Sequence, residues 1–311
     1  MISSSQTLTD IEKLPPVRGK LLKNAPLSDL TWFRVGGAAE ILFKPEDEQD
    51  LIHFLNYKPK NLPITVIGAT SNLLIRDGGI NGVVIKLGKN FAQMIYEENT
   101  IIVGAACLDV SVSRFALDHS LAGLEFLSGI PGTIGGGLRM NAGAYGKEFS
   151  DIVSKAKAID LNGHIHHLTL SDMGFKYRHC SIDKSFIFLN AQLKGYEDTS
   201  INIAQRMQEI QEKRIGTQPI RARTGGSTFA NPDPNLSHGK KAWQLIDEAG
   251  CRGLRKGDAM VSEMHCNFLI NNGAATAADI EELGEEVRQR VFDKSGIMLR
   301  WEIQILGNKI L

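Results

Sequence analysis

The chain has 311 residues, and its 35 lysines and arginines equal its 35 aspartates and glutamates, so the formal net charge is zero. A chain of this length suggests two domains or three small ones. The balanced charge excludes a global positive field that would draw the chain to nucleic acid or to an anionic membrane. We therefore expect a small-molecule partner, with no nucleic acid and no membrane.

Cysteine usage and the N-terminal sequence bear on the compartment. Cys107, Cys180, Cys251 and Cys266 form no C-x-x-C pair and no metal-like spacing, so we interpret them as reduced thiols and expect no metal site. No apolar run approaches the ~20 residues that a membrane span requires. The segment MISSSQTLTDIEK also lacks the apolar core of a signal peptide. These features predict a cytoplasmic protein.

The N-terminal part predicts an arm followed by strands and a helix. Residues 1–20 are mostly polar and contain two consecutive prolines, which indicates a loose arm. Residues 39–45 predict a strand, and residues 46–57 predict a helix whose first-turn acids suit the positive end of the helix dipole. A strand over 63–68 then enters a small polar turn before a second apolar strand over 82–87. Such a turn commonly presents backbone amides to phosphate.

The most informative segment runs from Leu121 to Gly146, directly after a helix predicted over 108–120. It contains eight glycines that alternate with apolar residues. Glycine can expose consecutive backbone N–H groups, which form a concave, partly positive surface for phosphate oxygens. A flexible linker would be polar, whereas here many large apolar side chains would have to face water. The segment therefore predicts an ordered ligand loop.

Asn162-Gly163 stands between two alternating segments, which is the strongest short-range signal for a β-hairpin. His164, His166 and His167 follow this turn. We interpret them as part of a solvated strand face rather than a metal site, because no cysteine or acidic partner is evident nearby.

The last third predicts two amphipathic helices and a final strand. Residues 200–216 predict a helix with a core stripe of Ile203, Met207 and Ile210. Thr276 and Asp279 form a capping box ahead of a second core stripe. The C-terminal residues 299–306 alternate as a strand, so that Glu302 points away from the aliphatic face. The second stripe consists of Ile280, Leu283, Val287 and Val291.

The common nucleotide-binding fingerprints do not occur in the chain. No G-x-G-x-x-G opens a helix after a strand, and no G-x-x-x-x-G-K-[ST] is present. Neither a Rossmann dehydrogenase nor a P-loop enzyme is supported. Ser227 lies in GGSTF, which is neither G-x-S-x-G nor the start of S-x-x-K, so it does not match a hydrolase nucleophile.

Several blocks in a fixed order nevertheless carry a resemblance to a known family. They are GLEFLSGIPGTIGG and MNAGAYG in the glycine-rich segment, the Tyr177-Arg178 dipeptide, GGSTFANP at 225–232 and the C-terminal LRWEIQILG. The chain resembles the UDP-N-acetylenolpyruvoylglucosamine reductases, flavoproteins of peptidoglycan precursor synthesis, over nearly its whole length from about residue 20.

The resemblance implies an α+β fold of the FAD-binding, vanillyl-alcohol-oxidase-like (PCMH-type) class with a C-terminal substrate domain. It divides the chain into the arm over 1–20, FAD-binding subdomains over 21–88 and 89–198, and a substrate-binding domain over 199–311.

The resemblance also implies non-covalent FAD, NADPH as co-substrate and a nucleotide sugar as substrate. Covalent attachment of the flavin is not expected, because Cys107 and the histidines lie outside the expected attachment loops. The residues implied to line the flavin and its pyrophosphate are Gly68, Ser71, Asn72, Gly129, Ile130, Pro131, Gly132, Thr133, Gly135, Gly136, Asn141, Ala142 and Gly143.

Three side chains are implied in the reduction of the enolpyruvyl ether, which adds hydride at C3 and a proton at C2. Arg178 would bind the carboxylate, Glu302 would hydrogen-bond the growing charge, and Ser227 would protonate C2. Without the resemblance, we would interpret Arg178 and Glu302 as charged surface residues and Ser227 as a turn residue. The further substrate contacts implied are Tyr177, Gly226 and Asn231.

The chain departs from the family pattern at several positions. Thr70 replaces a glycine, so either the turn avoids a positive φ or Thr70 is strained. Cys180 replaces a serine, and a thiol is a weaker hydrogen-bonding group. Ala230 replaces a lysine, whose contact Lys240 or Lys241 would have to supply.

Further differences concern the C-terminus and the middle of the chain. Gln304 stands where many members have a basic residue, and Arg300 lies on the same strand face as Glu302, ~7 Å away. The short middle resembles the subgroup that lacks a tyrosine-bearing flap, and we expect a monomer. Two other interpretations stay open: another FAD-dependent oxidoreductase of the same fold, and a non-catalytic flavin- or nucleotide-sugar-binding module.

Overall fold

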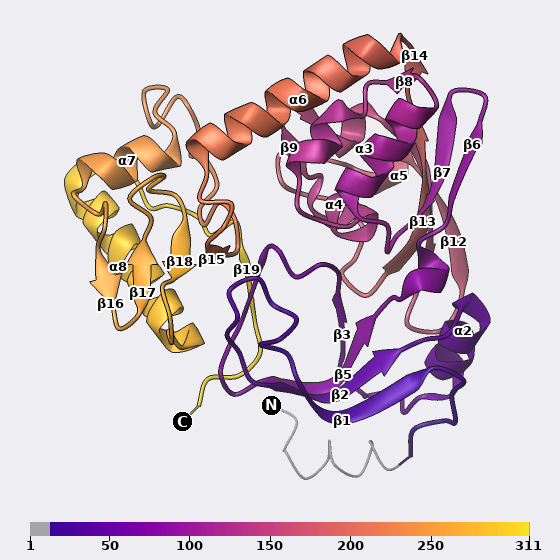
Figure 1. Cartoon of the computed structure of the whole chain (residues 1–311). Coiled ribbons are helices and arrows are strands. Elements are labelled where there is room, and N and C mark those ends of the chain that lie inside the picture. The colour runs from indigo at the N-terminus through magenta and orange to yellow at the C-terminus, as the bar shows by residue number, and fades with distance from the viewer. Residues whose placement is uncertain (1–12, 311) are drawn as a thin grey trace. The chain divides into compact units, whose positions relative to one another are not determined.

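The computed structural model of the chain describes residues 13–310 (Figure 1). These residues form two compact units, each built from several stretches of the chain. The first unit contains residues up to 25, residues 40–69 and residues 81–213, and the second contains residues 26–39, 70–80 and 214–311. Most of the predicted arm over 1–20 lies outside the described residues. The predicted subdomain boundaries stay a prediction.

A four-stranded sheet lies in the N-terminal part, with the order β1 (Lys20–Pro26), β2 (Ala38–Lys44), β5 (Ile80–Lys86) and β3 (Ile64–Ile67). Helix α2 (Glu48–Tyr57) packs on it, because Leu51 and Phe54 share a buried core with Phe43 of β2. The carboxylate of Asp47 accepts a hydrogen bond from the N–H of Asp50 and caps this helix. The strands and the helix predicted over residues 39–87 are confirmed.

A five-stranded antiparallel sheet forms the other part of the first unit. Its order is β12 (Ile165–Thr169), β11 (Val153–Ile159), β13 (Ile187–Lys194), β7 (Thr100–Gly104) and β6 (Met94–Glu97). Helices α3 (Asp109–Asp118) and α4 (Ile134–Met140) lie beside β7 and β13 in Figure 1 and share one apolar core with them. The shorter elements are η1 (Lys89–Phe91), β8 (Leu121–Ala122), η2 (Glu125–Gly129), β9 (Gly143–Ala144), β10 (Lys147–Glu148), η3 (Phe149–Asp151), α5 (Leu170–Met173) and β14 (Tyr196–Glu197).

The predicted hairpin is confirmed, since β11 and β12 pair antiparallel around Asn162-Gly163. The histidines after it have an acidic neighbour that the sequence analysis overlooked. Asp160 Oδ2 lies 3.3 Å from His164 Nδ1 and 3.0 Å from His166 Nε2. Among the described residues no group of histidine, cysteine, aspartate and glutamate side chains has the arrangement of a metal site.

The second unit packs helices α7 (Ala242–Glu248) and α8 (Ala277–Ser295) on an antiparallel sheet. The strand order is β15 (Arg223–Thr224), β18 (Leu269–Asn271), β17 (Ala259–Val261) and β16 (Arg255–Lys256). The capping box of Thr276 and Asp279 is present, and the apolar stripe of α8 is fully buried, as predicted. Strand β19 (Gln304–Leu306) pairs in parallel with β4 (Leu73–Ile75).

Two predicted elements differ from the structure. In helix α6 (Ser200–Thr217), Ile203 is buried, but Met207 and Ile210 are only half-buried, so the predicted core stripe is wrong for these two. The regular part of the final strand is shorter than predicted, although Leu299 and Ile303 are buried as expected. Within residues 13–310, no helix is both long enough and apolar enough to span a membrane.

Candidate functional site

The glycine-rich segment of the first unit is an ordered loop rather than a linker. Thr133 forms an antiparallel bridge with Leu108. On either side of this bridge, the N–H of Asp109 donates to the carbonyl of Gly132 at 3.1 Å and the N–H of Ile134 donates to the carbonyl of Cys107 at 3.0 Å. The loop is thereby fixed along the chain segment that leads into α3.

This loop also carries backbone donors without acceptors. Within the part of the chain that the structure describes, the N–H groups of Gly132, Thr133 and Gly136 make no hydrogen bond. Gly136 is exposed, and Gly132 is half-exposed. Adjacent N–H groups that lack acceptors form a surface suited to anionic oxygens. The arrangement fits the phosphate-binding role predicted for residues 129–136.

The turn after β3 meets the same loop. A Cβ atom on Gly68 would lie 2.6 Å from the hydroxyl oxygen of Thr133, so a larger residue here would force the Thr133 side chain to move. Lys86 is level with Ile67 because β3 and β5 run parallel, and its Nζ donates to the carbonyl of Gly68 at 2.6 Å. Burial, with a smaller effect of Lys44, lowers the pKa of Lys86. Lys86 is not among the site residues predicted from the sequence, where its only signal is a lysine at the end of a buried strand.

Tyr177 and Arg178 form the tip of a tight turn in the first unit. The backbone groups of Lys176 and His179 exchange two hydrogen bonds of 3.0 Å. Arg178 takes a left-handed conformation with φ of 53°. Its Nη2 donates to the carbonyl of Gly143 at 2.7 Å, and its guanidinium carbon lies 4.9 Å from the centre of the Tyr177 ring. The two predicted substrate residues are therefore in contact.

Asn141 connects this turn to the end of the glycine-rich loop. It is fully buried and caps α4 in a left-handed conformation. Its Nδ2 donates to the carbonyl of Lys176 at 3.1 Å, and its Oδ1 accepts from the N–H of Ser150 at 2.9 Å. The structure thus brings Asn141 and Gly143 together with Arg178 and Tyr177.

Cys180 lies in the core below the same turn. It is 6% exposed, and its thiol donates to the carbonyl of Met173 at 3.4 Å. Burial raises the pKa of the Cys180 thiol. Its replacement of a serine is accommodated inside the protein, where the thiol packs with apolar residues.

In the second unit, the segment around Ser227 lies beside the segment around Glu302. Phe229 forms an antiparallel bridge with Trp301, and their ring centres are 4.9 Å apart. The N–H of Glu302 donates to the carbonyl of Thr228 at 2.8 Å. Ser227 and Glu302 are both half-buried. Two of the three predicted catalytic residues therefore come from paired segments of one unit.

Asn72 joins this pair of segments. Its Nδ2 donates to the carbonyl of Glu302 at 3.2 Å, and its carbonyl accepts from the N–H of Gln304 at 2.9 Å. Thr70, two residues before Asn72, has a φ of 59°, so the turn does use a positive φ and Thr70 is strained. The hydroxyl of Thr70 donates to the carbonyl of Leu30. Ser71 borders Gly226, since a Cβ on Gly226 would lie 3.9 Å from the Ser71 carbonyl oxygen.

The remaining predicted contacts of this unit lie around the start of α7. Asn231 Oδ1 accepts a hydrogen bond from the N–H of Ala242 at 3.1 Å. Lys240 pairs with Glu248 at 2.8 Å, whereas the Lys241 side chain makes no such ion pair in the described chain. Ala230 is buried, and its N–H donates to the carbonyl of Arg300 at 2.9 Å. That Lys240 or Lys241 supplies the contact of the lysine that Ala230 replaces stays a prediction.

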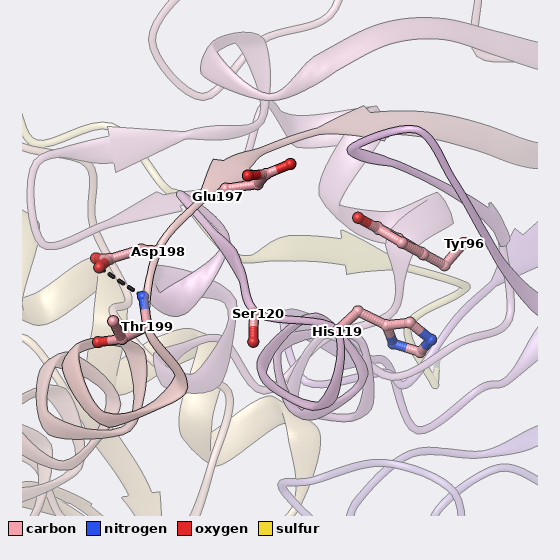
Figure 2. A pocket seen from close by; sticks show the side chains of 6 residues that line it. All are labelled: Tyr96, His119, Ser120, Glu197, Asp198 and Thr199. Atoms are coloured by element: carbon pink, nitrogen blue, oxygen red, sulfur yellow. Dashed lines mark hydrogen bonds between the residues drawn. The ribbon is translucent and has the colours of Figure 1, made fainter.

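An open pocket of about 470 Å³ lies elsewhere in the first unit (Figure 2). None of the predicted site residues lines it. The carboxylate of Asp198 faces the N–H of Thr199 and also pairs with Arg206, so its charge is already compensated. The lining residues are Tyr96, His119, Ser120, Glu197, Asp198 and Thr199.

Comparisons with known proteins match both parts of the chain. The family profile described as an FAD binding domain matches residues 39–169. The profile of the UDP-N-acetylenolpyruvoylglucosamine reductase C-terminal domain matches residues 218–306. Together these matches confirm the predicted fold class, an α+β FAD-binding fold with a C-terminal domain.

Individual relatives match over nearly the full length. A UDP-N-acetylenolpyruvoylglucosamine reductase from Rhodospirillum rubrum is 56% identical over 297 residues, which cover 96% of this chain and 93% of the relative. The enzyme of the same name from Parvibaculum lavamentivorans is 55% identical over 307 residues, covering 99% and 97%. The crystal structure of the reductase from Thermus caldophilus has a TM-score of 0.80 and 33% identity, covering 94% of this chain and all of that one.

Proposed function

Since the chain belongs to the family of UDP-N-acetylenolpyruvoylglucosamine reductases, we propose that it reduces UDP-N-acetylglucosamine enolpyruvate to UDP-N-acetylmuramate. FAD is the cofactor and NADPH the reductant, and the product is a precursor of peptidoglycan. The identity of 56% over 96% of the chain is the observation that carries this function.

The first unit fits the anionic part of FAD. The unpaired N–H groups of Gly132, Thr133 and Gly136 supply hydrogen-bond donors, and Lys86 supplies a positive charge beside Gly68. These residues would hold the pyrophosphate. Ser71 and Asn72 are further predicted cofactor contacts. The other predicted cofactor contacts are Gly129, Ile130, Pro131, Gly135, Asn141, Ala142 and Gly143.

The FAD held by these residues would supply the hydride chemistry, by which hydride from NADPH reaches C3 of the enolpyruvyl group. Arg178 binds the substrate carboxylate, because its planar guanidinium can make two parallel hydrogen bonds. Its left-handed backbone and its bond to Gly143 hold the guanidinium in place. As charge moves into the carboxylate, Glu302 in its protonated form donates a hydrogen bond to it.

Ser227 donates its proton to C2, which completes the saturated lactyl ether. The pairing of Thr228 with Glu302 supports this role, because it places the two residues on adjacent segments of one unit. A serine hydroxyl is a weak acid, so the transfer requires a basic enolate within hydrogen-bond reach. Tyr177, Gly226 and Asn231 are the proposed further contacts to the nucleotide sugar.

Finer assignments follow from this reaction. We propose that the enzyme is a monomer. We also place it in the cytoplasm, because its nucleotide-sugar substrate and NADPH are metabolites of that compartment. Through peptidoglycan supply it would contribute to cell shape and division.

The absorbance spectrum of the purified protein tests the function. We expect a flavin spectrum that bleaches on addition of NADPH and returns, without oxygen, on addition of the enolpyruvyl sugar nucleotide. Flavin that only oxygen reoxidises would favour another oxidoreductase of this fold or a binding module. Acid precipitation should release the flavin into the supernatant, since no covalent link is expected.

A further inference from the structure

Asp109, the first residue of α3, carries a carboxyl group that the chain does not satisfy. The residue is 0% exposed, and neither carboxyl oxygen has a hydrogen-bond partner within residues 13–310. The first turn of the helix does not supply one, because the N–H groups of Ser111 and Val112 donate to the carbonyl of Leu108. Buried polar groups are paired in nearly all native proteins, so this exception points to a role.

The carboxyl group lies against the predicted cofactor loop. A Cβ atom on Gly132 would be 2.6 Å from Asp109 Oδ2, so the carboxyl occupies the space that a side chain at Gly132 would need. The backbone N–H of Asp109 also donates to the Gly132 carbonyl at 3.1 Å. Asp109 therefore contacts the loop at the residue where the unpaired N–H groups begin.

Burial raises the pKa of Asp109 well above its ordinary value. The neighbouring titratable group is Cys107. Burial raises the pKa of its thiol to about 11, and the charge of Asp109 has a smaller effect in the same direction. The raised pKa values favour the neutral form of both groups. A carboxylate at this point would repel the phosphates that the loop N–H groups attract, whereas a neutral carboxyl adds a donor.

We propose that Asp109 is a positioning residue for FAD, which acts through Gly132 and gains its missing hydrogen bond when the loop holds the cofactor. This inference rests on the proposed FAD-dependent function. A hydrogen bond that forms only when FAD is bound strengthens FAD binding, because it stabilises the FAD-bound protein and not the FAD-free protein. Without FAD, the unpaired carboxyl group of Asp109 destabilises the folded chain.

The test compares three variants of the full chain by thermal melting at increasing FAD concentrations. The concentration dependence gives the FAD affinity, and extrapolation to zero FAD gives the stability of the chain alone. Asp109→Leu keeps the branched shape of the side chain and replaces both carboxyl oxygens with methyl groups. Asp109→Asn keeps a neutral donor. Asp118→Asn changes an exposed aspartate at the other end of the same helix and is the control.

We expect Asp109→Leu to bind FAD about tenfold more weakly while its melting temperature without FAD rises by roughly 2–4 °C. Asp109→Asn should bind FAD within about threefold of wild type, and the control should match wild type.

Three results would overturn the inference. They are wild-type FAD affinity in Asp109→Leu, a loss of stability or of folding in that variant, and an affinity of Asp109→Asn as weak as that of Asp109→Leu. Failure of the wild-type chain to bind FAD would instead refute the proposed function.

Discussion

The ammonium group of Lys86 donates a hydrogen bond of 2.6 Å to the carbonyl oxygen of Gly68. It therefore fixes the turn that meets Thr133 of the cofactor loop, and it brings a cation to a place where the proposed function puts a pyrophosphate. The cation is half-buried, and burial has lowered its pKa, so a nearby anion would stabilise its charged form.

The first prediction concerns this lysine. Lys86→Met should weaken FAD binding by about tenfold or more, because it removes a charge-assisted hydrogen bond and leaves a carbonyl unpaired. Titration of flavin fluorescence measures the dissociation constant. Lys89→Met, which changes an exposed lysine three residues later, should bind FAD normally. Unchanged affinity in Lys86→Met would mean that the lysine serves only the turn.

The second prediction concerns Arg178. Lysine keeps the positive charge but lacks the planar fork, so Arg178→Lys should lower kcat/KM for the enolpyruvyl substrate by about tenfold or more. Steady-state kinetics measure this loss. Lys176→Ala, in the same turn, is the matched control and should stay near wild type. Normal turnover by Arg178→Lys would show that another group holds the carboxylate.

The third prediction separates the two half-reactions at Ser227. Ser227→Ala should let NADPH reduce the flavin at a near wild-type rate, because this step needs no proton at C2. Reoxidation by the enolpyruvyl substrate should slow by about 10² to 10⁴-fold, the usual contribution of general acid catalysis. Stopped-flow absorbance follows both steps. Equal slowing of both would assign Ser227 to cofactor positioning, and Glu302 would become the next candidate for the proton donor.

The fourth prediction is a pH dependence of stability from Asp109. Its pKa in the folded chain is raised above the ordinary 3.8, so above that pH the unfolded chain ionises while the folded chain stays protonated. Wild type should therefore lose stability relative to Asp109→Asn as the pH rises from about 4, by up to about 1.4 kcal/mol per pH unit, until the folded group ionises. Cys107 contributes only as the pH approaches the ordinary thiol pKa of 9.0, because below it the thiol is protonated in both the folded and the unfolded chain.

Urea unfolding of both proteins without added FAD, at pH 4 to 8, measures this difference. A stability difference that is constant over the range would show that Asp109 is ionised in the folded chain.

Local patterns predicted much of the fold. The alternation around Asn162-Gly163 predicted a hairpin, and the capping box at Thr276 predicted the start of α8, because these signals lie within a few residues of the structure they specify. In α6 the same kind of pattern failed for Met207 and Ile210, since periodicity indicates an apolar face but not whether anything covers it.

The polar contacts of the candidate site were beyond sequence reasoning. The bond from Asn141 to Lys176 and the contact of Asp109 with Gly132 join residues that lie 35 and 23 positions apart. No pattern of residue spacing in the sequence predicts contacts between residues this far apart. A left-handed Thr70 was one of two alternatives that followed from the glycine in the family pattern, and the sequence did not decide between them. The compensating bond of Thr70 to Leu30 depends on the tertiary fold.

The second unit is assembled from three separate stretches, and this has a consequence for synthesis on the ribosome. Phe33, Val35 and Leu74 belong to its apolar core, and β4 is the pairing partner of the C-terminal strand β19. These early segments leave the ribosome long before the residues that bury them, so this unit can complete its folding only at the end of translation. A gene fragment beginning at residue 214 would lack part of its own core. Exchange of this unit between relatives therefore has to transfer all three stretches together.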